Sequence, residues 1–79
     1  MNELKEWMDF IDTECEIEFT YKEDMYVVKS FNGKRYIAKG EDILSKYYNN
    51  TAILEAFNLN NTCLKKLIKS NEVKIMTIF

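Results

Sequence analysis

Residues 14–21 alternate polar and apolar side chains without a break, and this run constrains the fold more than any other segment. Successive side chains of a strand point to opposite faces, so the run predicts a strand with one face on a core and the other toward water. The apolar residues on its inward side are Cys15, Ile17, Phe19 and Tyr21.

Two turns fix how this strand pairs with the residues that follow. Asn32-Gly33 supplies the two positive-φ residues of a type I′ hairpin turn, which pairs Val28 with Ile37. A separate turn at Lys22-Glu23 pairs Ile17 with Val28. The two registers agree, and together they predict a three-stranded antiparallel meander. Its core face carries Ile17, Phe19, Tyr26, Val28 and Ile37.

The opposite face of the predicted meander mixes apolar and charged side chains. An apolar patch with an acidic fringe is typical of a protein-binding surface. Either this surface is open, or another segment such as the first helix covers it. If it is open, we expect it to bind a protein through Glu16, Glu18, Met25, Val27 and Tyr36.

Helices and a last strand are expected around the meander. Leu4, Trp7, Met8 and Ile11 recur at helical spacing, which predicts a helix over residues 3–12 with Trp7 as its core anchor. Further helices are expected over 41–48, 51–57 and from about 61 to 70, the last capped by Asn60 or Asn61. Residues 73–79 are alternating and β-branched, which predicts a strand. The expected fold is α+β in one domain over residues 1–79: an N-terminal helix, the meander, two or three short helices and a C-terminal strand joining the sheet.

Size and composition limit the classes of protein. A chain of 79 residues, 47% hydrophobic, forms a core of marginal size, so we expect further burial against a protein partner or a second copy. The net charge of −2 counts against a free nucleic-acid binder. Short apolar runs and the lack of a signal-peptide pattern predict a cytoplasmic protein that does not span a membrane. Abundant Lys, Asn and Ile without proline indicate A/T-rich codons, as in low-GC bacteria, their phages or mobile elements.

Groups that carry out catalysis are scarce. The chain has no histidine, the commonest general base and metal ligand. Cys15 and Cys63 lack zinc-site spacing and are expected as reduced core thiols, and two glycines leave no phosphate-binding loop. Glu14, Glu16 and Glu18 are interpreted as solubilising charges on the outer sheet face. We therefore expect no enzyme, no cofactor and no metal.

Residues 51–69 resemble a helix-turn-helix of the excisionase or MerR type, with Asn58 in the place of the turn glycine. The resemblance implies DNA binding, with phosphates facing Lys65, Lys66 and Lys69. Leu54 departs from the family, which has a small residue there, and the second helix lacks an Arg or Gln to read bases.

A wider resemblance spans most of the chain. The strand at 17–21, the Asn32-Gly33 hairpin, the helical runs at 53–57 and 62–67 and the closing strand resemble small uncharacterised proteins of low-GC Gram-positive bacteria and their phages. This resemblance implies a layout of strands followed by helices, and it implies no activity.

Three functional hypotheses follow. The first is a non-enzymatic protein-interaction module, such as a phage or mobile-element accessory protein that binds a host protein. The second is the DNA-binding protein implied by the helix-turn-helix resemblance. The third is an acidic nucleic-acid mimic that inhibits a nucleic-acid-handling enzyme. The mimic would use Glu14, Glu16 and Glu18 with Asp9 and Asp12.

Overall fold

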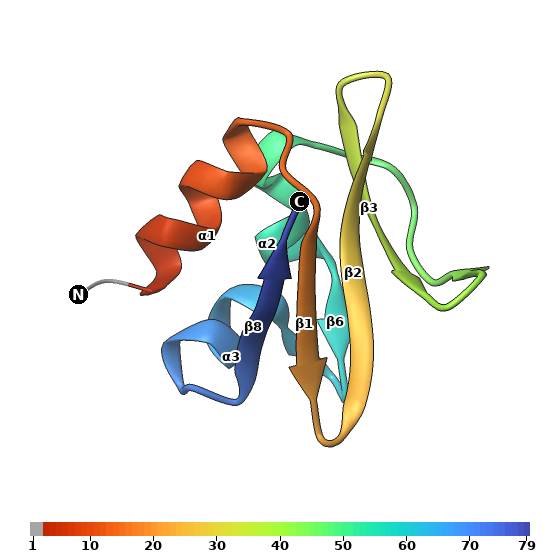
Figure 1. Ribbon diagram of the computed structural model, residues 1–79. Helices are drawn as coiled ribbons and strands as arrows, with labels where there is room; N and C mark the ends of the chain where they lie inside the picture. The colour runs from red at the N-terminus through yellow and green to blue at the C-terminus, as the bar shows by residue number, and fades with distance from the viewer. Residues whose placement is uncertain (1–2) are drawn as a thin grey trace.

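An antiparallel sheet with helices on one face forms the body of the protein in a computed structural model, which describes residues 3–79 (Figure 1). The sheet order is β4-β3-β2-β1-β8, and β5 also pairs with β3. The fold class is α+β, as the sequence predicts. The sheet strands are β1 (Ile17–Tyr21), β2 (Asp24–Phe31), β3 (Lys34–Lys39), β4 (Asp42–Ile43), β5 (Tyr48–Asn49) and β8 (Val73–Ile78).

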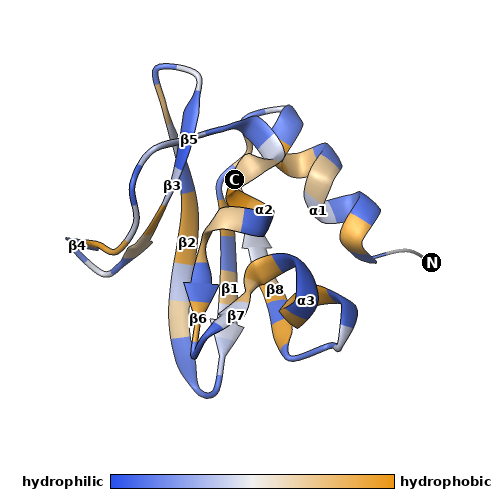
Figure 2. Cartoon of the chain, turned by 180° about the vertical axis from the view of Figure 1, so that it is seen from behind, coloured by the Kyte–Doolittle hydropathy of each residue, from blue (hydrophilic) through white to orange (hydrophobic). Residues whose placement is uncertain are grey.

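Short elements cover a single face of this sheet, which we call the inner face. Figure 2 shows α2, α3 and the β6–β7 hairpin lying across it, with α1 beside them. The opposite, outer face carries no helix among residues 3–79. The covering elements are α1 (Glu3–Asp12), a 3₁₀ turn η1 (Asn50–Ala52), α2 (Ile53–Ala56), β6 (Asn58–Leu59), β7 (Thr62–Cys63) and α3 (Leu64–Lys69).

The meander has the register that its turns predict. Val28 pairs with Ile17 on one side and with Ile37 on the other, and all three side chains are fully buried. Both hairpins turn through two residues of positive φ, as a type I′ turn requires. The φ angles are 47° and 70° at Lys22 and Glu23, and 49° and 75° at Asn32 and Gly33.

Aromatic rings join α1 to the sheet. Trp7 is 2% exposed and meets Phe19 edge-on, with 5.2 Å between ring centroids. Phe19 in turn stacks on Tyr26 at 5.5 Å. Such pairs stabilise beyond the burial of their area, by about 0.5–1.5 kcal/mol each. The predicted helix over residues 3–12 and its Trp7 anchor are therefore confirmed.

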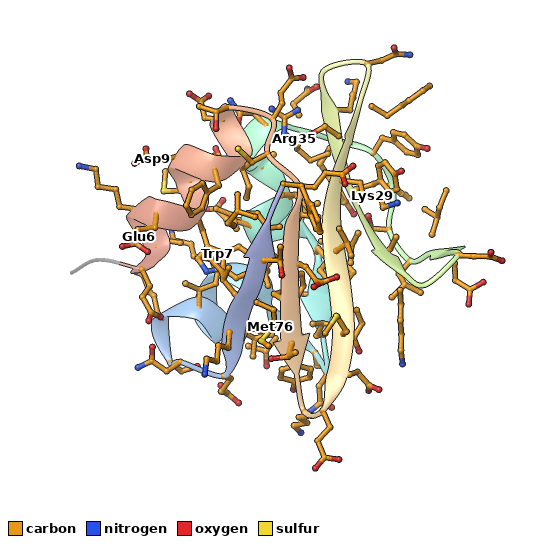
Figure 3. The ribbon with its side chains drawn as sticks, in the orientation of Figure 1. Glu6, Trp7, Asp9, Lys29, Arg35 and Met76 are labelled. Carbon is orange, nitrogen blue, oxygen red and sulfur yellow. The ribbon has the colours of Figure 1, made fainter. Side chains whose placement is uncertain are left out.

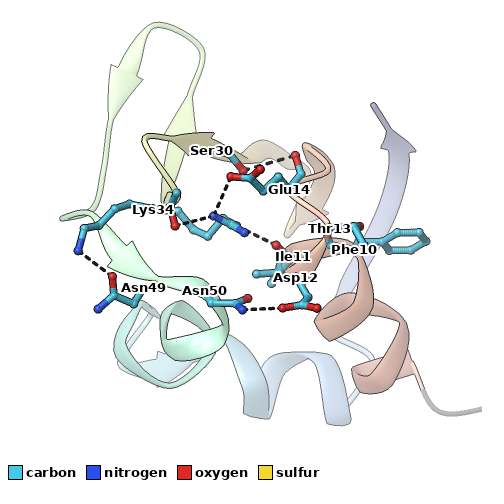
Figure 4. A network of polar contacts seen from close by, with 11 residues as sticks. Phe10, Ile11, Asp12, Thr13, Glu14, Ser30, Lys34, Asn49 and Asn50 are labelled. Atoms are coloured by element: carbon cyan, nitrogen blue, oxygen red, sulfur yellow. Dashed lines mark hydrogen bonds and ion pairs between the residues drawn. The ribbon is translucent and has the colours of Figure 1, made fainter.

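A buried arginine links the end of α1 to β3 (Figure 4). Arg35 is 3% exposed. Its Nε donates a hydrogen bond to the Ile11 carbonyl at 2.8 Å, and its Nη1 donates to the Gly33 carbonyl at 2.9 Å. Nη1 also lies 3.8 Å from Glu14 Oε1. Ile11 is in the last turn of α1, so the cation bonds to one of the terminal helix carbonyls and lies at the negative end of the helix dipole.

Glu14 does not belong to the outer row of acids that the sequence predicts. The strand begins only at Ile17, and Glu14 ends α1 with a φ of 62°. Its N–H donates to the Ile11 carbonyl, and the N–H of Cys15 donates to the Phe10 carbonyl, the pattern of a Schellman motif. The reversal turns the Glu14 carboxylate toward Arg35.

The helix predicted over 41–48 is wrong. Gly40, with a φ of 61°, starts a two-residue turn, and Lys39 then pairs with Asp42 and Ala38 with Ile43. A glycine in the first central position is the signature of a type II′ hairpin turn. Pairing with β3 therefore extends the sheet where a helix was expected.

The capping role predicted for Asn60 and Asn61 is also wrong. Their φ angles of 54° and 63° form the turn of the β6–β7 hairpin, and α3 begins after Cys63. Asn58 is the first residue of β6. Residues 51–69 thus connect α2 and α3 by a hairpin, where the helix-turn-helix resemblance implies a short turn.

The C-terminal strand joins the sheet as predicted. β8 pairs antiparallel with β1, and the register shifts between Glu18 and Phe19 because β8 contains a bulge. Cys15 and Cys63 are free thiols, but both are half-buried and so are only partly the core residues that the sequence predicts.

A candidate protein-interaction surface

The outer face of the sheet is the main functional candidate among the described residues. Strand pairing places Glu18 beside Val27, Val27 beside Ala38, and Ala38 beside Ile43. These four neighbours form a row across β1, β2, β3 and β4 on the side that no helix covers. By alternation, the same face also carries Glu16, Thr20, Met25, Lys29, Phe31, Lys34 and Tyr36.

The centre of this face is partly buried, and its margins are exposed. Ala38 is 4% exposed, and Val27 and Tyr36 are half-buried. Met25 is 43% exposed and Ile43 is 55% exposed. Such a platform, with protruding apolar side chains, can bury area against a partner while the rigid strands lose little conformational entropy.

An aromatic cluster extends the platform at the β2–β3 end. The Tyr47 ring stacks on Tyr36 at 4.9 Å with 24° between planes, and it meets Phe31 edge-on at 6.0 Å. Phe31 and Tyr47 remain 55% and 45% exposed. The chain between β4 and β5 therefore contributes Tyr47 to the outer face.

Sequence reasoning placed Met25, Val27, Tyr36, Glu16 and Glu18 on this face, and pairing and alternation do so too. Glu16 and Glu18 are half-buried. The contributions of Phe31, Ile43 and Tyr47 were missed. The signal for Ile43 was Gly40 directly after a strand, which favours a hairpin turn over a helix start. Nothing local predicts the stacking of Tyr47.

Charged side chains surround the platform with both signs. Glu18 lies on β1 and Glu16 directly precedes that strand, whereas Lys29 lies on β2 and Lys34 on β3. Figure 3 shows Lys29 at the β2–β3 side and Met76 in front of β1 and β8. Met76 is 52% exposed and adds a further apolar side chain near this edge.

The lysines of the DNA-binding hypothesis lie on α3, away from the outer face. Lys65 is half-buried, and its Nζ lies 3.2 Å from Glu55 Oε1. Lys66 and Lys69 are exposed and one helical turn apart.

The acids of the mimic hypothesis are distributed over several elements. Asp9 and Asp12 lie on α1, where Asp12 Oδ1 accepts a hydrogen bond from Asn50 at 2.6 Å. Glu14 pairs with Arg35 on the helix side, whereas Glu16 and Glu18 lie on the outer face. The five carboxylates therefore do not form one row.

Other site types have little support in residues 3–79. That part of the chain holds no group of three or more His, Cys, Asp or Glu side chains placed to bind a metal ion. No helix within it is long and apolar enough to span a membrane. Comparisons with protein-family models, with curated proteins and with solved structures find no significant match to this chain.

Proposed function

We propose that this protein is a non-enzymatic module that binds another protein through the outer face of its sheet. The observation that carries the proposal is the set of large apolar side chains exposed on a face without a helix. Interface cores are enriched in aromatic residues and methionine, and the outer face supplies both. The exposed set is Met25, Phe31, Ile43 and Tyr47.

The rim of the face supports selective binding. Acidic Glu16 and Glu18 and basic Lys29 and Lys34 are arranged on neighbouring strands. A rim with separated charges of both signs favours one orientation of the partner, since the reversed orientation would bring like charges together.

The amino-acid composition, which reflects codon usage, supports a more specific proposal about the partner. Abundant Lys, Asn and Ile without proline fit a low-GC bacterium, its phages or its mobile elements. The module would then be an accessory protein that binds a host protein. A second copy of the chain is the competing occupant of the outer face, and a light-scattering mass distinguishes the two.

Paired methionine variants test the surface. Met25 on the outer face and Met8 on α1 are 43% and 41% exposed, so each accepts a glutamate at similar cost. Tagged wild-type protein, M25E and M8E are used to capture proteins from a lysate of the encoding organism. We expect M25E to lose the captured partner and M8E to retain it. If M25E and a second variant, I43E, both retain it while remaining folded, the outer face is not the binding surface.

Binding of DNA through Lys65, Lys66 and Lys69 is the alternative proposal, supported by the exposure of the last two on one side of α3. Two features weaken it: Lys65 already pairs with Glu55, and α3 has six residues. A gel shift at low salt with mixed duplexes separates the proposals. Binding that falls steeply with salt and is lost in the triple Lys→Ala variant supports DNA binding, and the absence of a shift refutes it.

A further inference from the structure

A groove of about 510 Å³ lies between α1 and the edge strand β8, apart from the outer face. Trp7 extends from α1 toward β8 in Figure 3 and is nearly buried at 2% exposure. One wall comes from the helix and the other from the strand. The groove residues used below are Glu3, Glu6 and Trp7 on α1 and Val73, Lys74 and Ile75 on β8.

β8 presents unpaired backbone along this groove. It is the last strand of the sheet order and pairs with β1 alone among the described strands. Glu16 and Phe79 exchange two backbone hydrogen bonds: the Glu16 N–H donates to the Phe79 carbonyl at 3.3 Å, and the Phe79 N–H donates to the Glu16 carbonyl at 2.9 Å. In an antiparallel ladder the bonding direction alternates, so Phe19 and Tyr21 bond to β2, and the residues of β8 opposite them, Ile75 and Val73, point their N–H and C=O away from β1. A free edge of this kind can pair with an added strand.

The bulge in β8 argues against a second β8 as that added strand. Ile75 pairs with Phe19 and Thr77 with Glu18, so Met76 is an extra residue that interrupts the regular edge. Bulges and edge lysines such as Lys74 oppose indiscriminate pairing between like edges. An occupant would instead be selected by its side chains.

The side chains around the groove define that occupant. Val73 and Ile75 belong to the inner side of β8, beside Trp7, and Glu3 and Glu6 provide two carboxylates on the facing helix wall. Lys74 pairs with Thr20, so its side chain starts from the outer side of the strand. The helix side of the groove therefore complements long cationic side chains, whose aliphatic stems pack on apolar surface while their charges reach the carboxylates.

We propose that this groove binds an extended segment of a partner protein, added as a strand to β8, with lysine or arginine at the alternate positions that face α1. The inference does not rest on the outer-face function. A partner can engage either surface without the other.

An NMR titration with defined peptides tests the groove. The probe is a capped peptide that alternates Lys and Thr and has the six-residue length of β8. There are two matched probes. One has Glu in place of every Lys, and the other carries N-methyl groups on alternate backbone amides. We expect the first probe to shift the amide signals of residues 73–78 and the indole signal of Trp7 in a saturable way. The two matched probes are expected to lose this effect.

Variants assign the charge contribution. E3Q/E6Q is expected to lower the affinity for the Lys–Thr peptide roughly fivefold to tenfold. The control E23Q/E41Q makes the same change in net charge at exposed sites elsewhere and is expected to leave this affinity unchanged. The proposal is overturned if no saturable shift occurs, if the shifts map away from β8 and α1, or if either matched probe binds equally well.

Discussion

Replacing Arg35 with methionine tests whether the buried guanidinium fixes α1 to the sheet. The Arg35 side chain is 4% exposed, and methionine preserves much of its apolar stem without any donor. The Ile11 carbonyl would lose the buried bond of 2.8 Å from the charged Nε and would keep only the bond of 3.1 Å from the Glu14 N–H. The Gly33 carbonyl, bonded at 2.9 Å, would lose its partner where water has partial access.

The magnitude follows from these lost bonds. A buried hydrogen bond from a charged donor, as at the Ile11 carbonyl, contributes about 1.5–3 kcal/mol, and the loss at the part-buried Gly33 carbonyl costs at most about 1 kcal/mol. The pair with Glu14, whose side chain is 58% exposed, adds less than about 1 kcal/mol. The sum is about 2–4 kcal/mol. A domain of this size has a total unfolding free energy of roughly 4–12 kcal/mol, so R35M should be severely destabilised.

Urea unfolding followed by circular dichroism measures this loss. We expect a lower midpoint for R35M at an unchanged slope, an intermediate midpoint for R35K, which keeps a cation without the planar donor fork, and a change below about 1 kcal/mol for E14Q. A free energy of unfolding for R35M within about 0.5 kcal/mol of the wild-type value would refute the reasoning, because two carbonyls would then have lost a bond from a charged donor at no cost.

Three further substitutions test local conclusions by thermal unfolding. K22N/E23G should raise the free energy of unfolding by about 1 kcal/mol, or roughly 4–8 °C in Tm, because non-glycine residues there adopt φ angles of 47° and 70°. An unchanged Tm would show that the turn is unstrained. N71A should lower the free energy by about 1 kcal/mol while N71G does not, since Asn71 ends α3 with a φ of 59°; equal effects would contradict this. W7A should cost about 3–5 kcal/mol and W7F less, and a loss below about 1 kcal/mol would mean that Trp7 does not anchor α1.

The central meander was predictable because its information is local. Asn32-Gly33 specifies one turn and the alternation around Ile17 specifies the inward face, so a single register satisfies both. The helix around Trp7 was predictable for the same reason, since its apolar stripe is formed within one segment. Lys22-Glu23 lacks turn-forming residues, yet the flanking strands impose positive φ on both.

The remaining elements depend on contacts between distant residues. Pairing with β3 overrides the helix start that Glu41-Asp42 favours, and the stacking of Tyr47 on Tyr36 places that segment on the outer face. Alternation alone puts Arg35 on the inner side, but the carbonyls of Ile11 and Gly33 and the carboxylate of Glu14 explain why a cation is buried there. The candidate surface was accordingly found in part: its β1–β3 residues other than Phe31 followed from register, and the residues from the β4–β5 region did not.

Photo-crosslinking tests the central claim, that the uncovered outer face binds a protein. A benzophenone side chain is placed at position 25 on that face or, as the control, at position 8 on α1, two sites of nearly equal exposure at 43% and 41%. Irradiation in a lysate of the encoding organism should attach a defined protein at position 25 and not at position 8. Attachment from position 8 alone, or none from position 25, would contradict the account.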